Sequence, residues 1–321
     1  MRLAILGCGS IGRRHLRNLQ QLDYSELIAF DPAESARKEV IDEMGVEVAD
    51  NLDDVWKWNP QVVLVCGPSN LHCELALEAV QRHCHLFLEK PLSHTLDGLG
   101  PLLSEVNRQR LTTMVGCNMR FHPGPRKVKS LIEEGAVGRV IAARIQTGSY
   151  LPRWRPLQDY RLSYSASPEW GGAVLDCIHE IDLALWYFGP AKVRGAACLP
   201  ATCIGLETVG LAEMLLEHDC GSLSNVHLNF LQRDYRRTCQ VIGTEGTIYW
   251  NFNDRRVLLL GPEGESLQEF SEPEGWQVNQ MFIEEIQHFL EAIHCGRPTC
   301  NPISQSLAAL KIALAVKSCF K

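Results

Sequence analysis

A short glycine-rich run near the N-terminus, Gly7-Cys8-Gly9-Ser10-Ile11-Gly12, constrains the fold more than any other part of the chain. It follows directly after the apolar run Leu3–Leu6 and opens an amphipathic stretch, so it stands between a predicted strand and a predicted helix. In that position the glycines let bare backbone and a helix N-terminus approach a pyrophosphate group. The sequence therefore predicts a dinucleotide-binding βαβ unit. The residues expected at the pyrophosphate are Gly7, Gly9, Ser10, Ile11 and Gly12.

Residues 1–121 continue this pattern, because short apolar runs alternate with longer amphipathic stretches. Such alternation is typical of a parallel sheet with helices on its faces. The apolar runs are too continuous for one face to lie in water, so their strands are expected to be buried. Strands are predicted at residues 3–6, 27–30, 62–66, 85–88 and 113–115, and a helix over 71–82.

The pattern changes at the proline- and glycine-rich residues 121–125, after which long β-type runs prevail. The sequence thus predicts an α/β protein with an N-terminal Rossmann domain over residues 1–121 and a C-terminal α+β domain over 122–321. The second domain is expected to contain a large, mostly antiparallel open sheet, and the last helix is a candidate to pack back on the first domain. Strands are predicted at 140–150, 210–216, 222–230, 239–242, 247–252 and 257–260, with helices at 281–294 and 304–319.

Composition excludes several classes of protein. The 321 residues include 31 Lys and Arg against 38 Asp and Glu, so the net charge of −7 offers no excess of cations for a nucleic acid. No stretch approaches the ~20 apolar residues of a membrane-spanning helix, and the first apolar run stops at Gly7, too early for a signal peptide. We therefore expect a cytoplasmic protein without nucleic-acid or membrane partners.

Thirteen cysteines are spread along the chain, in an odd number and without a C-x-x-C pair. This usage indicates reduced, structural thiols. His72, His83, Cys84 and His85 are close in sequence, but alternate residues of a strand point to opposite faces of a sheet. No metal site is predicted.

Asp31 directly follows the second predicted strand. A carboxylate at this point of a dinucleotide-binding unit accepts hydrogen bonds from the 2′-hydroxyl of a ribose. It also repels a 2′-phosphate, so Asp31 favours NAD over NADP as the cofactor. The alternative stays open because Arg13, Arg14 and Arg37 are close enough in sequence to reach such a phosphate.

Polar residues follow two further strands of the predicted parallel sheet. Ligands of open α/β sheets bind outside the carboxyl ends of the strands, so both segments are expected to face the cofactor. These residues are Pro68, Ser69, Asn70 and His72 after the strand at 62–66, and Glu89 and Lys90 after the strand at 85–88.

Four motifs in this order resemble the glucose-fructose oxidoreductase and inositol dehydrogenase (Gfo/Idh/MocA) family. They are Gly7-x-Gly9-x-x-Gly12-x-x-His15, Pro68-Ser69-Asn70-x-His72, Glu89-Lys90-Pro91 and Gly116-x-Asn118-x-Arg120-Phe121-x-Pro123, and the resemblance runs from residue 1 to about 190. It implies that Lys90 reaches both cofactor and substrate and that Asp176 and His179 act on the same substrate. Asn118 is expected at the cofactor and Arg120 at the substrate.

Asp176, His179 and Asp182 are spaced i, i+3 and i+6, so they would form one polar stripe if residues 171–182 were helical. In an alcohol dehydrogenation, a histidine takes the hydroxyl proton and a carboxylate fixes its tautomer. A cationic Lys90 would stabilise the developing alkoxide. The predicted catalytic residues are Lys90, His179 and Asp176. Many members of the family have the Asp and His four residues apart rather than three, so Asp182 remains an alternative to Asp176.

Trp154, Arg155, Tyr160 and Arg161 are expected at the substrate, because aromatic faces stack on sugar rings and arginine binds carboxylate or phosphate. A plain surface loop with a packed tryptophan is the alternative. The segment is similar to a branch of the family from bacterial surface-sugar and nonulosonate pathways. This implies a nucleotide sugar, an amino sugar or a nonulosonate as substrate.

These observations predict an NAD(P)-dependent oxidoreductase that moves a hydride between nicotinamide and a secondary hydroxyl or ketone of a sugar-like substrate. The alternatives are a redox-neutral NAD-dependent glycosidase or epimerase and a non-catalytic dinucleotide-binding sensor. A homodimer or homotetramer is expected, because an open sheet needs one face covered.

Overall fold

The computed structural model describes residues 1–154, 156 and 158–320, and the chain divides into two compact units. The first comprises Met1–Asn118 and Val278–Leu307, and the second Met119–Gln277 and Ala308–Lys321. Residues 278–307 therefore lie in the first unit, although the sequence analysis placed all of 122–321 in the second domain. Side chains of this segment bond to the backbone of the last strand of the first unit, from Thr299 to the carbonyl of Thr113 and from Asn301 to that of Val115.

The first unit contains a parallel sheet of six strands in the order β3-β2-β1-β4-β5-β6. Its central strands are buried on both faces, as their continuous apolar runs require. The strand order reverses between β1 and β4, where doubly wound sheets bind ligands at the carboxyl ends of their strands. The strands are β1 (Leu3–Leu6), β2 (Leu27–Phe30), β3 (Glu47–Val48), β4 (Val62–Val65), β5 (His85–Glu89) and β6 (Thr113–Gly116).

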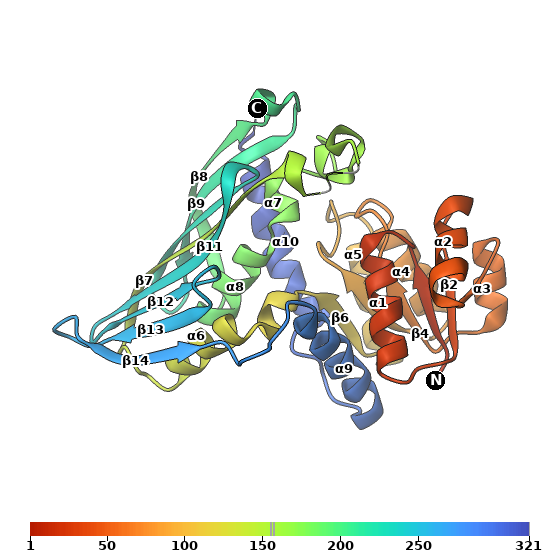
Figure 1. Cartoon of the computed structure of the whole chain (residues 1–321), viewed down its shortest axis with the longest axis horizontal. Coiled ribbons are helices and arrows are strands. Elements are labelled where there is room, and N and C mark those ends of the chain that lie inside the picture. Colours follow the sequence, from red (N-terminus) through yellow and green to blue (C-terminus); the bar gives the residue numbers. More distant parts are fainter. Residues whose placement is uncertain (155, 157, 321) are drawn as a thin grey trace. The chain divides into compact units, whose positions relative to one another are not determined.

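Helices flank this sheet, and α1 packs against α9 while α4 packs against α5 (Figure 1). The buried side of α1 carries Gly12, His15, Leu16 and Leu19, with the spacing of one helical face. The predicted Rossmann fold is confirmed. The helices are α1 (Ser10–Gln21), α2 (Glu34–Met44), α3 (Leu52–Trp58), α4 (His72–Gln81), α5 (Leu99–Gln109) and α9 (Asn279–Cys295).

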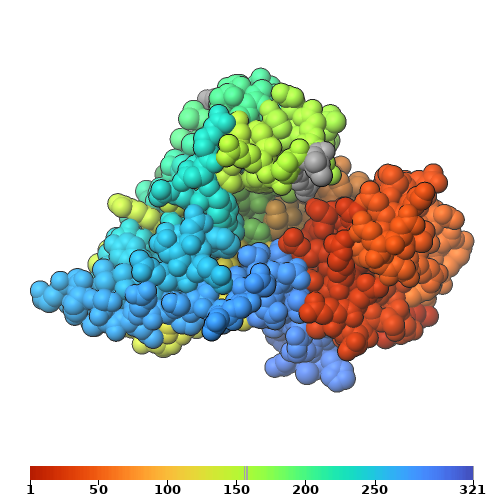
Figure 2. Space-filling view, viewed as in Figure 1, coloured from red at the N-terminus to blue at the C-terminus, as the bar shows by residue number. Residues whose placement is uncertain are grey.

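The second unit contains an eight-stranded sheet in the order β14-β13-β12-β11-β7-β10-β9-β8. Among the strands that the structure describes, β7 and β10 are parallel and every other neighbouring pair is antiparallel, so the predicted mostly antiparallel sheet is confirmed. Figure 2 shows the edge around β13 and β14, in light blue, as a narrow projection. The strands are β7 (Val140–Tyr150), β8 (Ala191–Pro200), β9 (Val209–His218), β10 (Leu223–Asn229), β11 (Leu231–Gly243), β12 (Thr247–Asn251), β13 (Arg256–Leu260) and β14 (Ser266–Ser271).

The helices α6 (Pro123–Glu133), α7 (Ala173–Asp176) and α8 (His179–Phe188) pack against one face of this sheet. The division into units falls within the last helix, α10 (Ile303–Lys317). Side chains that alternate along the strands point away from these helices, and among them Leu215, Leu223 and Tyr249 are exposed. Within the described residues, no helix combines the length and the apolar character that crossing a membrane requires.

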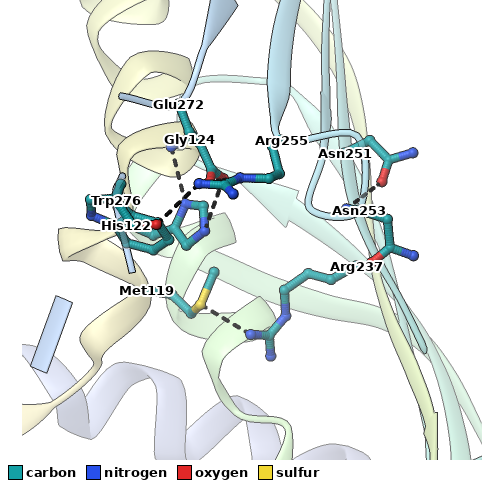
Figure 3. Close-up of polar contacts among 9 residues, drawn as sticks. All are labelled: Met119, His122, Gly124, Arg237, Asn251, Asn253, Arg255, Glu272 and Trp276. Atoms are coloured by element: carbon teal, nitrogen blue, oxygen red, sulfur yellow. Dashed lines mark hydrogen bonds and ion pairs between the residues drawn. The ribbon is translucent and has the colours of Figure 1, made fainter. Parts of the chain in front are cut away.

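A polar cluster around the buried side chains of His122 and Glu272 lies at the N-terminus of α6 (Figure 3). His122 accepts a hydrogen bond at Nδ1 from the amide of Gly124, and its Nε2 lies 3.3 Å from Glu272. Arg255 binds the other oxygen of Glu272 and the carbonyl of Trp276. Burial, together with the charges of Arg237 and Arg255, lowers the pKa of His122 to about 3. The ring is therefore neutral, with its proton on Nε2, and it joins α6 to the segment after β14.

All thirteen cysteines are free thiols, and six of them are buried. Burial raises the pKa of Cys8 and Cys239 to about 12, so both remain protonated at neutral pH. In the part of the chain that the structure describes, no three His, Cys, Asp or Glu side chains are grouped as a metal site.

Candidate active site

The glycine-rich loop closes tightly on itself but leaves space at its middle glycine. Gly7 has a φ of +106°, and a Cβ there would lie 2.7 Å from the amide nitrogen of Gly67. A Cβ at Gly12 would lie 1.9 Å from the carbonyl oxygen of Gly7, whereas a Cβ at Gly9 would meet nothing within 4 Å. Ser10 and Ile11 begin α1 at this point. The loop thus presents open backbone at a helix N-terminus, which fits the pyrophosphate of a dinucleotide.

Asp31 lies at the end of β2 with both carboxylate oxygens held by backbone amides. Oδ2 accepts a hydrogen bond from Cys8 at 2.8 Å, and Oδ1 accepts one from Ala33 at 2.9 Å. The first contact ties the carboxylate to the glycine-rich loop. This position fits recognition of a ribose hydroxyl by the remaining lone pairs of the carboxylate.

Arg13, Arg14 and Arg37 are the arginines that left NADP as an alternative cofactor, and each of them contacts another group of the protein. Arg37 donates to the backbone carbonyls of Asp31 and Pro32, and Arg13 pairs with Glu39. The guanidinium of Arg14 lies 4.3 Å from the centre of the Phe282 ring. Asp31 places a carboxylate directly against the loop, which favours a cofactor without a 2′-phosphate.

Topology brings the other predicted cofactor residues to this same edge of the sheet. Because all six strands are parallel, their carboxyl ends meet along one edge. The residues after β4 are Pro68, Ser69, Asn70 and His72, those at the end of β5 are Glu89 and Lys90, and Asn118 follows β6. Their side chains differ, however, in what they contact.

Two of these residues, Glu89 and His72, form buried contacts within the protein. Glu89 pairs with Nε2 of His15 at 2.7 Å, and His72 faces the backbone carbonyls of Gly67 and Pro91. Both are therefore better described as parts of the framework around Lys90 than as direct contacts to a cofactor. The sequence analysis quoted His15 within a motif but did not name it as a site residue.

In the second unit, Asp176 and His179 flank a break between two helices. Asp176 is the last residue of α7 and His179 the first of α8, and Cys177 between them has a φ of −95° and a ψ of 30°. The continuous helix that the sequence analysis considered for 171–182 is therefore wrong at this point. Both side chains are buried. Figure 1 shows α7 and α8 beside the sheet of this unit.

Two acidic residues of α8 are paired with arginines. Arg120 binds both carboxylate oxygens of Asp182, at 2.6 and 2.8 Å, and Arg237 lies 2.7 Å from Glu180. Figure 3 shows that Arg237 also reaches the sulfur of Met119. Arg120, which was expected at the substrate, has a buried guanidinium that is paired with Asp182. Asp182 is thus bound by Arg120, whereas Asp176 lies across the helix break from His179.

The predicted substrate-binding segment is only partly accessible. Trp154 is 40% exposed and donates from Nε1 to Ser149, whereas the hydroxyl of Tyr160 is bonded to the carbonyl of Ile204. Arg161 is exposed and lies 3.7 Å from Asp159. Arg155 lies outside the described residues. Tyr160 thus has a packing role in this unit, and Trp154 is the aromatic ring that the segment presents.

The sequence analysis missed a pair of arginines beside this segment. Arg153 and Arg233 lie 5.9 and 3.9 Å from the ring centre of Tyr150. Among the described residues, neither has a carboxylate partner within 4 Å. Arg233 lies on β11, far from Arg153 in the sequence, so no local sequence pattern predicts that the two arginines lie together.

The chain is similar to known proteins in both of its units. Residues 1–117 match the family described as "Oxidoreductase family, NAD-binding Rossmann fold", and residues 126–249 match the "GFO/IDH/MocA C-terminal domain". The chain is 27% identical to myo-inositol 2-dehydrogenase of Thermotoga maritima, over 99% of this chain and 95% of that protein. It is 24% identical to the NAD⁺-dependent scyllo-inositol 2-dehydrogenase of Bacillus subtilis, over 100% and 94% of the two chains.

Solved structures share the fold over almost the whole chain. Levoglucosan dehydrogenase in complex with NADH and L-sorbose has a TM-score of 0.87 at 19% identity, covering 99% of this chain and 96% of that one. A UDP-N-acetylglucosamine 3-dehydrogenase from Acidithiobacillus ferrooxidans has a TM-score of 0.80 at 18% identity, covering 99% and 97%.

Proposed function

The chain belongs to the Gfo/Idh/MocA family of NAD-binding oxidoreductases, and we propose that it transfers a hydride between NAD and a secondary hydroxyl or ketone of a sugar-like substrate. Two relatives with which it aligns over nearly its full length are inositol 2-dehydrogenases, which act on a ring of secondary alcohols. The open backbone at Gly9 and the carboxylate of Asp31 support NAD as the cofactor.

We assign the proton chemistry to His179, with Asp176 as its orienting carboxylate. The observation that carries this assignment is the helix break, which puts the buried Asp176 and His179 at the adjoining ends of α7 and α8. In the oxidation, His179 accepts the proton of the substrate hydroxyl. The ammonium group of Lys90 stabilises the negative charge that develops on this oxygen. A bound nicotinamide supplies the hydride-accepting centre.

For the substrate class, we propose a sugar derivative with an anionic substituent, such as a nucleotide sugar or a nonulosonate. Arg153 and Arg233 support this proposal, because their guanidinium groups lie beside Tyr150 and neither is paired with a carboxylate of the described residues. Arginine binds carboxylates and phosphates through paired hydrogen bonds. Replacement of both arginines by Gln is expected to raise KM for the anionic substrate. The increase in KM should be smaller at high salt, because salt screens the attraction between the arginines and the substrate. An unchanged KM would limit the substrate to neutral sugars and polyols.

Turnover and cofactor binding should be measured separately to test the proposal. A panel of inositols, sugar acids and nucleotide sugars is screened with NAD⁺, and NADH affinity is measured by energy transfer from tryptophan. Lys90→Ala and His179→Ala are each expected to abolish turnover and to leave NADH affinity almost unchanged. His294→Ala, on the exposed side of α9, serves as a control. Full activity in both site variants would contradict the proposal.

The same experiment separates dehydrogenation from redox-neutral chemistry. With substrate in excess, a dehydrogenase accumulates NADH, whereas a glycosidase or epimerase that returns its hydride does not.

We also propose that the protein forms a homodimer or homotetramer through the outer face of its large sheet, where Leu215, Leu223 and Tyr249 are exposed. Light scattering of the purified protein measures the oligomeric state.

A further inference from the structure

Each residue that flanks Lys90 is held by a buried histidine. Glu89 precedes Lys90, and its Oε1 lies 2.7 Å from Nε2 of His15. Pro91 follows Lys90, and its carbonyl oxygen lies 2.8 Å from Nδ1 of His72. The two histidines are 0% and 1% exposed, so neither is in a position to bind substrate.

The contact through His15 leads from Lys90 to the helix behind the glycine-rich loop. His15 lies on α1, three residues after Gly12, and its ring packs edge-on against Phe87 of β5 at 5.3 Å. Because a carboxylate only accepts hydrogen bonds, Nε2 of His15 donates to Glu89. The second oxygen of Glu89 accepts the backbone amide of Lys90 at 3.2 Å. A continuous path of hydrogen bonds therefore joins α1 to the backbone of Lys90.

The contact through His72 leads to the same loop from the other side. The second ring nitrogen of His72 lies 2.9 Å from the carbonyl oxygen of Gly67, in the turn after β4. Gly67 packs against the glycine-rich loop, since a Cβ added at Gly7 would lie 2.7 Å from its amide nitrogen. His72 thus joins the turn after β5 to the turn that supports Gly7. Burial lowers the pKa of His72, so its neutral ring donates a hydrogen bond to one of these two carbonyls and lies against the other.

We propose that His15 and His72 are positioning residues that couple binding of a dinucleotide at the glycine-rich loop to the placement of Lys90. The proposal rests on the role of Lys90 in the proposed function. Binding of the pyrophosphate orders the loop, and the two histidines transmit this order to both sides of Lys90. Sequence reasoning could not find the coupling, because each contact joins residues that are 19 or 74 positions apart.

Hydrogen–deuterium exchange measured with and without NADH tests the coupling independently of turnover. In the natural protein, NADH is expected to slow exchange in residues 7–12 and also in residues 85–92. In His15→Leu and His72→Leu, slowing is expected to persist in 7–12 and to disappear from 85–92. His15→Gln and His72→Gln keep a side-chain donor, so NADH should again slow exchange in residues 85–92 to some extent. These variants should also remain folded if the leucine variants do not.

A matched control comes from the opposite end of the same strand. His85 is the first residue of β5, and its Nδ1 accepts a hydrogen bond from the amide of Thr112. His85→Leu makes the same substitution in β5 but leaves the contacts of Glu89 and Pro91 in place. NADH should therefore still slow exchange in residues 85–92 of this variant. With the substrate found by screening, kcat should fall by up to about 100-fold in His15→Leu and His72→Leu, the effect of a small misplacement of a catalytic group. KM should change much less.

The possible results separate this proposal from the proposed function. If NADH slows exchange in 7–12 and in 85–92 of every variant alike, the coupling is wrong while NAD binding stands. If NADH has no effect on residues 7–12 of the natural protein, the cofactor assignment fails and the coupling with it. Loss of the response in 85–92 in the leucine variants, with recovery in the glutamine variants, supports the coupling.

Discussion

Both carboxylate oxygens of Asp182 accept hydrogen bonds from Arg120, at 2.6 and 2.8 Å, and both side chains are buried. The pair involves Asp182, which the sequence left as the alternative to Asp176 for orienting His179. Asp182 lies on α8 three residues after His179, and its carboxylate forms an ion pair with Arg120. We propose Asp176, buried at the end of α7 three residues before His179, as the carboxylate that orients the imidazole.

Removal of Arg120 should destabilise the protein, because it leaves the charge of Asp182 buried without its partner. Arg120→Met is expected to lower the free energy of unfolding by about 3–5 kcal/mol, measured by urea denaturation. The exposed pair of Arg236 and Asp234 provides the control, and Arg236→Met should cost less than about 1 kcal/mol. A double variant, Arg120→Met with Asp182→Leu, should recover much of the loss. Equal losses in the two arginine variants would contradict this reading of the pair.

Substitution by alanine should affect two glycines of the cofactor loop differently, lowering stability at Gly12 and NADH affinity at Gly9. A Cβ at Gly12 would lie 1.9 Å from a backbone oxygen, so Gly12→Ala should cost about 1–3 kcal/mol of stability. Gly9 has a φ of −68° and open space around it, so Gly9→Ala should change stability by less than about 0.5 kcal/mol. Its methyl group would occupy the space offered to the pyrophosphate. NADH affinity should therefore fall at least about tenfold in Gly9→Ala, or ~1.4 kcal/mol, in a fluorescence titration.

An undiminished NADH affinity in a stable Gly9→Ala protein would show that the dinucleotide does not approach this loop. Thermal unfolding of both variants provides the control, because it separates a loss of affinity from a loss of folded protein.

Asp31 should determine the preference for NADH over NADPH. Asp31→Asn keeps an oxygen that can accept one backbone amide but removes the negative charge beside the ribose. Hydrogen bonds to a charged group contribute ~1.5–3 kcal/mol, so NADH affinity should fall by about 10- to 100-fold. NADPH should bind as well as before or better, since its phosphate no longer meets a carboxylate. Parallel titrations with the two cofactors measure the ratio, and Asp42→Asn on the exposed side of α2 is the control.

The first unit could be predicted closely from the sequence, because its signals are local. Continuous apolar runs identified β1, β2, β4, β5 and β6, and the residues that follow each strand are the ones at the carboxyl edge. Membership of the Gfo/Idh/MocA family and NAD as cofactor are likewise confirmed. The second unit was less readable. The edge strands β8 and β14 were missed, because their many partly exposed residues give no clear hydrophobic alternation.

The contacts that fix the site lay beyond the reach of sequence patterns. Arg120 and Asp182 are 62 positions apart, and Arg237 and Glu180 are separated by a similar length of chain, so each pair forms only through the tertiary fold. The break between α7 and α8 carries no proline, and the spacing of Asp176 and His179 therefore read as one helix. The sequence likewise offered no sign that Arg120 is buried and paired with Asp182.

His122 should make the stability of the protein depend on pH. Its folded-state pKa is lowered to about 3 by burial and by the charges of Arg237 and Arg255, whereas an unfolded histidine titrates near pH ~6.5. The unfolded chain therefore binds a proton that the folded chain refuses. This stabilisation is fully present above about pH 6.5 and is lost as the pH falls towards about 3, at a limiting slope of ~1.4 kcal/mol per pH unit.

Urea denaturation at about pH 6.5 and pH 5 measures this effect, which should amount to roughly 1.5 kcal/mol for His122. His122→Asn keeps an acceptor for the amide of Gly124 and cannot be protonated, so its stability should fall less between the two pH values. His294→Asn, exposed at the end of α9, should retain the pH dependence of the natural protein because water surrounds that ring in both states. If His122→Asn loses as much stability as the natural protein on acidification, the ring already carries a proton in the folded state. Glu272, 3.3 Å from Nε2, would then be an ionic partner of His122 rather than an acceptor for a neutral ring.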